Sequence, residues 1–231
     1  MSKILFVVTG ADHWTLADGT KHPSGFWAEE AVAPYEAFRA AGHEVVVATP
    51  GGVVPTVDRA SLGAAVNGGQ EGADKVAAGL AAMTELQHPI RLEDVDLDDY
   101  AAVFYPGGHG PMEDLSADAV SGRLLVDTLA SGKPLAVVCH GPAALLAAEQ
   151  EDGTNAFAGY RVAAFTNAEE IQGGLADRAE WLLQDRLTEA GVQVEAGEPW
   201  APKVVVDREL VTGQNPASST PVAAELLKKL A

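Results

Sequence analysis

The chain has 231 residues, of which 47% are hydrophobic, enough to bury a sizeable core in one α/β domain. Its 15 basic and 33 acidic residues give a formal net charge of −18, which argues against nucleic acid or an anionic membrane as a partner, because both require basic surface. A single cysteine excludes an internal disulfide, and the N-terminal apolar run is too short to cross a bilayer, so we expect a soluble, cytoplasmic protein.

Short β-branched segments alternate with longer helical patterns along the first half of the chain. Residues 3–9 (KILFVVT) are typical of a central parallel strand, residues 26–42 have a helical period despite an internal proline, and residues 44–50 (EVVVATP) predict the next strand. Residues 51–98 are less regular and flank the expected ligand pocket. Within them, the Ala-rich stretch 74–83 predicts a helix lying over the edge of the sheet.

The second half is predicted to contain, in chain order, a strand that ends in a glycine-rich turn (100–110), a helix (117–131), a buried strand (134–139), a strand (160–167), an amphipathic helix (176–191), a strand pair (203–213) and a closing helix capped by Ser218 or Ser219. This alternation predicts an α/β fold, in which residues 1–231 form a single domain: a doubly wound, flavodoxin-like α/β/α sandwich with a mainly parallel sheet. Ligands of such sheets bind beyond the carboxyl ends of the strands. The loop after Thr9, the turn 107–110 and Cys139 are expected at that edge.

Cys139 stands where the strand PLAVVC turns into a helix opened by Gly141 and Pro142. A nucleophile at such an elbow is lifted clear of the sheet, and the N–H groups that follow point to the place where an oxyanion would form. The start of a helix also lowers the pKa of a thiol. The alternative is a buried small hydrophobic residue, the common state of free cysteine. The position before His-Gly-Pro favours a nucleophile.

The turn PGGHG, Pro106–Gly110, supplies a second part of the expected site. Glycines allow backbone N–H groups to approach a bound anion, as an oxyanion hole requires. A Gly-Gly pair alone is most often just a turn. Its place at the end of a strand that should neighbour PLAVVC makes it a candidate oxyanion loop.

Five motifs resemble the ThiJ/PfpI superfamily, which has the fold of the class I glutamine amidotransferases: GFWAEEAVAPYEAF, YPGGHG, AVVCHGPAALL, FTNAEE and LVTGQNPASS. With the matching first strand, the resemblance runs from residue 3 to about residue 219, nearly the whole chain. The motifs are most similar to the branch that contains heat-shock chaperones and glutathione-independent glyoxalases (glyoxalase III).

The resemblance implies roles for individual residues. Cys139 matches the nucleophile and His140 the histidine that follows it. Glu30 matches the family's pocket glutamate, although a shift of one residue would select Glu29 instead. Glu170 matches the acid that orients the histidine in some relatives, whereas others use an aspartate from another position. The N–H groups of Gly108 and His140 would form the oxyanion hole.

The activity implied by the resemblance is the conversion of methylglyoxal or a similar 2-oxoaldehyde to the 2-hydroxy acid, as in a glyoxalase III-type lyase, without glutathione, metal or cofactor. Other members are hydrolases or hydratases of small molecules. An oxidation-responsive stress protein or chaperone that uses the same cysteine, and a non-catalytic binding module, remain open. The glutamine amidotransferase triad needs a histidine well downstream of the cysteine, and none of the six histidines follows residue 140.

A metal site is not expected, although some relatives bind zinc with two histidines and a glutamate. His13, His22 and His109 should lie near the pocket rim, but no pair has a diagnostic spacing. Aromatic residues are most often core or interface, and four of them also qualify as pocket walls: Trp14, Phe26, Trp27 and Trp200. The resemblance further implies a homodimer.

Overall fold

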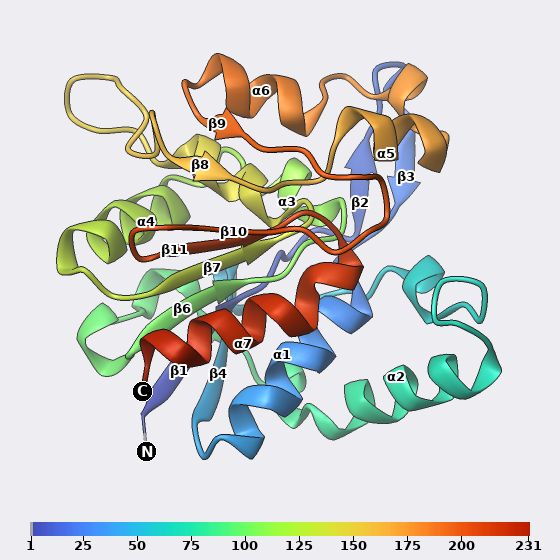
Figure 1. The fold of residues 1–231 in the computed structure, drawn as a ribbon, viewed down its shortest axis with the longest axis horizontal. Coiled ribbons are helices and arrows are strands. Elements are labelled where there is room, and N and C mark those ends of the chain that lie inside the picture. The colour runs from blue at the N-terminus through green and yellow to red at the C-terminus, as the bar shows by residue number, and fades with distance from the viewer. Residues whose placement is uncertain (1) are drawn as a thin grey trace.

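The computed structural model describes residues 2–231 and is built around a seven-stranded sheet (Figure 1). Its strand order is β10-β11-β7-β6-β1-β4-β5, and every pair is parallel except β10–β11. Two further pairs, β2–β3 and β8–β9, lie outside it. The strands are β1 (Lys3–Val7), β2 (His13–Thr15), β3 (Lys21–Pro23), β4 (Glu44–Thr49), β5 (Ile90–Arg91), β6 (Ala102–Tyr105), β7 (Leu135–Val138), β8 (Arg161–Val162), β9 (Gln193–Val194), β10 (Val204–Asp207) and β11 (Leu210–Gly213).

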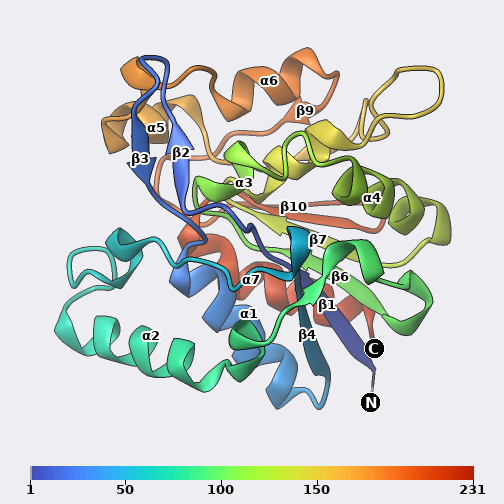
Figure 2. The same ribbon diagram turned by 180° about the vertical axis from the view of Figure 1, so that it is seen from behind.

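Helices cover both faces of this sheet. On one face α7 packs against α1 and against β7 and β11, while α3 and α4 lie on the opposite face, as the two views from front and back show (Figures 1 and 2). The helices are α1 (Ala28–Ala40), α2 (Gln70–Ala82), α3 (Gly110–Glu113), α4 (Ala119–Ser131), α5 (Asn167–Gly173), α6 (Leu183–Glu189) and α7 (Ser219–Lys229). The predicted doubly wound α/β fold is confirmed.

The apolar composition of the middle strands explains why this sequence forms a sheet that is covered on both faces. Strands β6 and β7 are buried along their whole length, and β1 is buried after its first residue. A strand that is covered by helices on both faces needs apolar side chains at successive positions, which is what KILFV, AVFY and LAVV provide. Because these strands are parallel, their carboxyl ends meet at one edge, where the functional residues gather.

Two predicted elements of the second half are shorter than expected, and a third is a helix of another type. Of the strand predicted at 160–167 only β8 forms, because the next backbone donors turn elsewhere: Ala163 N–H bonds Thr212 Oγ1 and Phe165 N–H bonds the Cys139 carbonyl. The helix predicted at 176–191 is reduced to a 3₁₀ turn followed by α6. The helix after Cys139 is a 3₁₀ helix, Gly141–Ala147.

Other segments also differ from expectation. The segment between β1 and α1, predicted as a loop, contains the β2–β3 hairpin. Helix α2 packs on α1 rather than over the sheet edge. Ser218 does occupy the position before α7, but its hydroxyl bonds the backbone of Lys203 instead of capping the helix. Among residues 2–231, no helix combines the length and apolar character that a membrane crossing needs.

Candidate active site

Cys139 follows β7 at a strained turn. Its φ is 60°, a left-handed conformation that non-glycine residues rarely adopt, and the side chain is 3% exposed. Hydrogen bonds hold its backbone on both sides: its N–H donates to the Gly213 carbonyl at 2.8 Å, and its carbonyl accepts from Phe165 N–H at 2.9 Å. The elbow expected from the sequence is therefore present, with the thiol at the base of a cavity.

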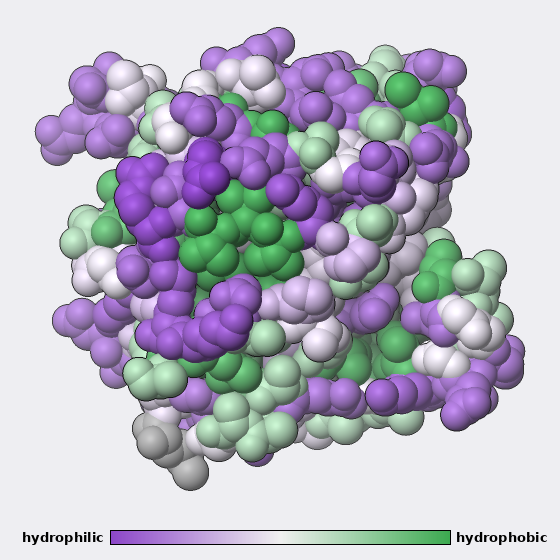
Figure 3. Space-filling view, viewed as in Figure 1, coloured by the Kyte–Doolittle hydropathy of each residue, from purple (hydrophilic) through white to green (hydrophobic). Residues whose placement is uncertain are grey.

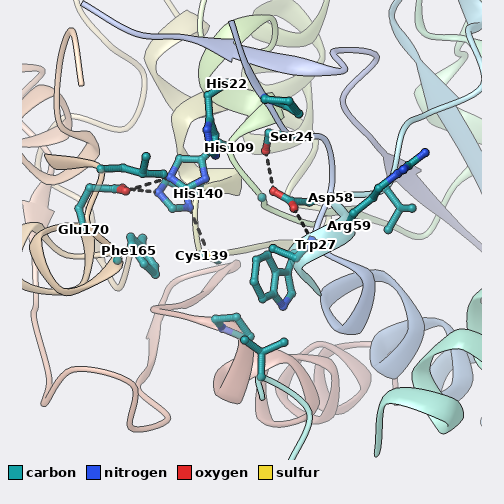
Figure 4. A pocket seen from close by; sticks show the side chains of 18 of the residues that line it. His22, Ser24, Trp27, Asp58, Arg59, His109, Cys139, His140, Phe165 and Glu170 are labelled. Atoms are coloured by element: carbon teal, nitrogen blue, oxygen red, sulfur yellow. Dashed lines mark hydrogen bonds and ion pairs between the residues drawn. The ribbon is translucent and has the colours of Figure 1, made fainter. Parts of the chain in front are cut away.

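His140 connects this thiol to a carboxylate. Its Nδ1 lies 3.4 Å from Cys139 Sγ, and its Nε2 lies 2.8 Å from Glu170 Oε2 (Figure 4). Burial and the neighbouring His109 lower the pKa of His140 to about 4, so the imidazole is neutral at physiological pH. Burial alone would raise the pKa of Glu170, but the hydrogen bonds from both histidines outweigh it and lower the pKa. Glu170 is thus a carboxylate that fixes the orientation of the ring.

His109 is a second histidine on the same carboxylate. Its Nε2 lies 3.0 Å from Glu170 Oε1, its ring centroid is 4.1 Å from that of His140, and it stacks on the buried Trp14 at 4.6 Å. The sequence pattern predicts only a position near the pocket rim for His109. Its position directly after Gly108, in the candidate oxyanion loop, was the one sequence signal for a place in the site. Its contact with a carboxylate could not be predicted, because Glu170 lies 61 residues away in sequence.

Glu30, on the first turn of α1, faces the thiol from the opposite side. Its Oε2 accepts the Gly107 N–H at 2.7 Å, while Oε1 has no hydrogen-bond partner of good geometry among residues 2–231. Burial raises the pKa of Glu30 to about 8, so the carboxyl holds its proton near neutral pH. Glu29 instead lines a separate cavity beside α2. Of the two acids, the structure places Glu30 in the site.

The thiol itself differs from the sequence expectation of a lowered pKa. Burial, followed by the adjacent Glu30, raises the pKa of Cys139 well above its usual range, and the Gly108 N–H opposes this only in part. The 3₁₀ helix that follows is short, so the expected effect of a helix start is small. A thiolate can form here only while Glu30 remains protonated or the thiol proton passes to His140.

The glycine turn closes the site. Gly108 has φ 90°, and its N–H is directed at Cys139, where it can serve an oxyanion. Gly107 has no space for a side chain: an added Cβ would lie 2.7 Å from His140 N and 2.8 Å from Glu30 Oε2. The backbone N–H groups of Gly108 and His140 lie on the two loops that meet at the thiol, and their service as an oxyanion hole stays a prediction.

A cavity of about 620 Å³ opens above the thiol. The β2–β3 hairpin and the segment 56–60 contribute to its rim, so the loop after Thr9 and part of the segment 51–98, which was predicted to flank the pocket, both line it. Trp27 and Trp200 are among its walls, whereas Trp14 and Phe26 belong to the buried core.

A metal ion has one plausible set of ligands among residues 2–231. The donor atoms of His109, His140 and Glu170 all lie within 4.8 Å of one another, and two of the three are predicted catalytic residues. Of the other loop histidines, His13 pairs with Asp12 and Glu113 and His22 lines the cavity wall. An ion bound to this set would occupy the Nε2 atom through which His140 contacts Glu170.

The site thus combines a buried cysteine at a strand–helix elbow with a histidine–carboxylate pair, in an α/β protein whose sheet is mainly parallel. The model of the DJ-1/PfpI family matches residues 23–229, and the chain belongs to this family.

The sequence is similar to those of two named proteins. The chain is 35% identical over 139 residues to the bovine "Glutamine amidotransferase-like class 1 domain-containing protein 1", a match that covers 60% of this chain and 63% of that protein. It is 28% identical over 230 residues to "Protein/nucleic acid deglycase HchA" of Staphylococcus aureus, covering 94% of this chain and 76% of the relative.

Solved structures show the same fold over the whole chain. The Rapid Encystment Protein 24 kDa of Francisella tularensis superposes with a TM-score of 0.86 at 28% identity, covering 100% of both chains. Glyoxalase III of Candida albicans superposes with a TM-score of 0.84 at 24% identity, covering 98% of this chain and 96% of that one.

Proposed function

We propose that the protein is a cysteine-dependent enzyme that converts methylglyoxal, or a similar 2-oxoaldehyde, and water into the 2-hydroxy acid without glutathione or metal. The observation that carries the proposal is the convergence of three groups on the Cys139 thiol: the neutral His140 imidazole, the protonated Glu30 carboxyl and the Gly108 N–H. The similarity to the staphylococcal protein, which is named a protein/nucleic acid deglycase, supports an enzymatic function.

The first step forms a covalent adduct. Cys139 Sγ attacks the aldehyde carbon C1 while His140 Nδ1, 3.4 Å away, accepts the thiol proton. The former aldehyde oxygen receives hydrogen bonds from the N–H groups of Gly108 and His140, and protonation gives a hemithioacetal. Glu170, on the far side of the ring, stabilises the imidazolium that forms for the duration of this step.

The second step moves hydrogen from C1 to C2. The base beside C1 is either His140, neutral again after protonating the adduct oxygen, or Glu30 once it has given up its own proton. It removes the C1 proton while the C2 oxygen takes up a proton, which gives an enediol; C2 then receives a proton and the C1 hydroxyl loses its own. The product is a thioester of the 2-hydroxy acid on Cys139. Water then attacks this thioester, the C–S bond breaks, and the thiol is regenerated. The sum is one 2-oxoaldehyde plus one water to one 2-hydroxy acid, with no external oxidant or reductant.

The test is lactate formation from methylglyoxal without glutathione or added metal. Wild type should form lactate, and Cys139→Ala should form none above the blank. His140→Ala should lose at least about 100-fold in kcat/KM, because general acid–base groups contribute that much or more. Absence of lactate with correctly folded wild type would refute the proposal for this substrate. Ready oxidation of Cys139 by peroxide in that same sample would then favour the stress-protein alternative.

A further inference from the structure

Two aromatic side chains flank the nucleophile. In Figure 4 the Phe165 ring and the Trp27 indole lie on either side of Cys139. Both are fixed by backbone hydrogen bonds to the loops of the site itself, since Trp27 N–H donates to the Gly107 carbonyl at 3.0 Å and Phe165 N–H donates to the Cys139 carbonyl at 2.9 Å. The backbone positions from which both rings project are therefore tied to the loops that carry the thiol.

The Phe165 wall extends outward. Its ring packs on His140 at 4.2 Å, and the half-exposed Trp200 contacts the edge of Phe165 at 5.6 Å. Trp200 is held at φ 64° by a hydrogen bond from its N–H to the buried Glu169 at 2.9 Å. Aromatic surface thus runs continuously from the ring beside the thiol to the mouth of the cavity.

The cavity is much larger than methylglyoxal needs. Its volume of about 620 Å³ falls in the range of roughly 300–1,000 Å³ that is typical of pockets for drug-sized ligands. Methylglyoxal has five non-hydrogen atoms, and its methyl group would leave most of the aromatic wall in contact with water. Such surface stabilises a bound substrate only where the substrate covers it.

The charged side chains along the cavity wall further limit which substrate substituents the cavity can accept. Arg59 is the one cationic side chain among the described lining residues, and Figure 4 shows it extending away from Cys139. The nearby Asp58 is buried and already bonded to Ser24, while Glu170 is engaged by two histidines. Next to the thiol an anionic substituent would therefore meet carboxylates, while the one cation of the lining points away, so the substituent that fits there is uncharged and apolar.

We propose that this cavity selects 2-oxoaldehydes whose ketone carbon bears a bulky apolar group, an aromatic ring above all, with Trp27 and Phe165 as the specificity-determining residues. The inference rests on the proposed function: Cys139 attacks C1, and the group on C2 enters the space between the two rings. A planar group there would make offset or edge contacts with both walls. Relative to methylglyoxal, kcat/KM for phenylglyoxal should be at least about 10-fold higher, the lower limit for one well-filled apolar subsite.

The experiment compares the methyl, isobutyl and phenyl members of one substrate series, with formation of the matching 2-hydroxy acid as the readout. Cys139→Ala serves as the blank, because phenylglyoxal also reacts with arginine side chains. We expect kcat/KM to rise from methyl to isobutyl to phenyl. A fourth substrate with a carboxylate on its side chain should be turned over more slowly than the isobutyl compound.

Variants of Trp27 and Phe165 test whether these two side chains cause the preference for phenylglyoxal over methylglyoxal. Trp27→Ala should reduce the phenyl-to-methyl ratio of kcat/KM by about 10-fold, and Phe165→Leu, which keeps an apolar side chain of similar bulk, should reduce it less. The matched control is Trp181→Ala, a tryptophan outside the cavity that packs under Arg186 and should leave the ratio unchanged.

The outcomes separate the two proposals. No product from any substrate would contradict the proposed function. Turnover of methylglyoxal with a flat or falling series, or an unchanged ratio in both folded wall variants, would overturn this inference and leave the proposed function intact.

Discussion

At the scale of single residues, Glu30 has the clearest energetic consequence. A fully buried carboxyl cannot ionise without losing the hydration of its charge, and this cost of burial outweighs the hydrogen bonds that Cys139 and the Gly107 N–H offer to the ionised form. The folded protein therefore holds a proton on Glu30 up to a pH of about 8, whereas the unfolded chain releases it near its ordinary pKa of 4.5. A group whose pKa is raised by folding stabilises the fold at low pH, and this contribution is lost as the pH rises toward the folded value.

Glu30→Gln should remove this pH dependence. The free energy of unfolding of wild type should fall relative to the variant by about 1.4 kcal/mol for each pH unit between 4.5 and 8. Urea denaturation at pH 5 and pH 8 measures the difference. Glu29→Gln is the matched control and should change it less, because Glu29 is only partly buried.

The same variant should lose at least about 100-fold in turnover, because an amide cannot donate and accept the proton that the proposed isomerisation needs. Unchanged turnover together with unchanged thiol alkylation would contradict the role given to Glu30. A parallel pH dependence of unfolding in wild type and Glu30→Gln would show that the carboxyl is not buried as described.

At the scale of elements, the elbow stores strain. Cys139 adopts φ 60° between β7 and a 3₁₀ helix, and its backbone is bonded to the end of β11 and to Phe165. The surrounding loops determine this conformation, since a side chain at positive φ costs about 1–2 kcal/mol. The strain lifts the thiol out of the sheet and into the cavity.

Glycine should therefore be the better residue at this position for stability. Cys139→Gly should unfold at higher urea concentration than Cys139→Ala, by about 1 kcal/mol. At an ordinary helical position the order reverses: Ala77→Gly, at an exposed position in the middle of α2, should be destabilising by about 0.5–1 kcal/mol. Equal stability of the two Cys139 variants would mean that the elbow relaxes once the thiol is removed.

The elements also show where sequence-based reasoning succeeds and where it stops. Apolar runs located the central strands and placed Cys139 at a strand end, because periodicity and length are local properties. The departure of the chain after β8 was not predictable, since it depends on the distant Thr212 and Cys139 as acceptors. The contact of His109 with Glu170 likewise joins two loops that share no local pattern.

At the scale of the whole molecule, the excess of acidic residues shapes encounters with partners. Most of the face shown in Figure 3 is hydrophilic, with an apolar area around the edge strand β10, where Val206 is 39% exposed. A net charge of −18 repels polyanions at long range, and salt only screens that repulsion. The homodimer implied by the resemblance stays a prediction.

Duplex DNA should therefore not bind to this protein, although the name of the staphylococcal relative includes nucleic acids. A mobility assay with a labelled duplex at low salt, where electrostatic contacts are strongest, should show no shift at micromolar protein. A basic DNA-binding protein in the same gel confirms that the duplex is competent. A saturable shift that weakens as salt is added would contradict the prediction.

Gly107 has a consequence for how variants of this chain should be interpreted. Gly107 lies where the elbow, the glycine turn and α1 meet. These elements can approach so closely only because it has no side chain, since one methyl group would collide with His140 N and Glu30 Oε2. In a mutational scan, alanine at this position should abolish activity, and abundance should fall as well, because two of the atoms it would meet, His140 N and Val138 O, belong to the backbone. Among natural sequences, any residue other than glycine there would mark a pseudoenzyme: a lineage that kept the scaffold and abandoned the chemistry.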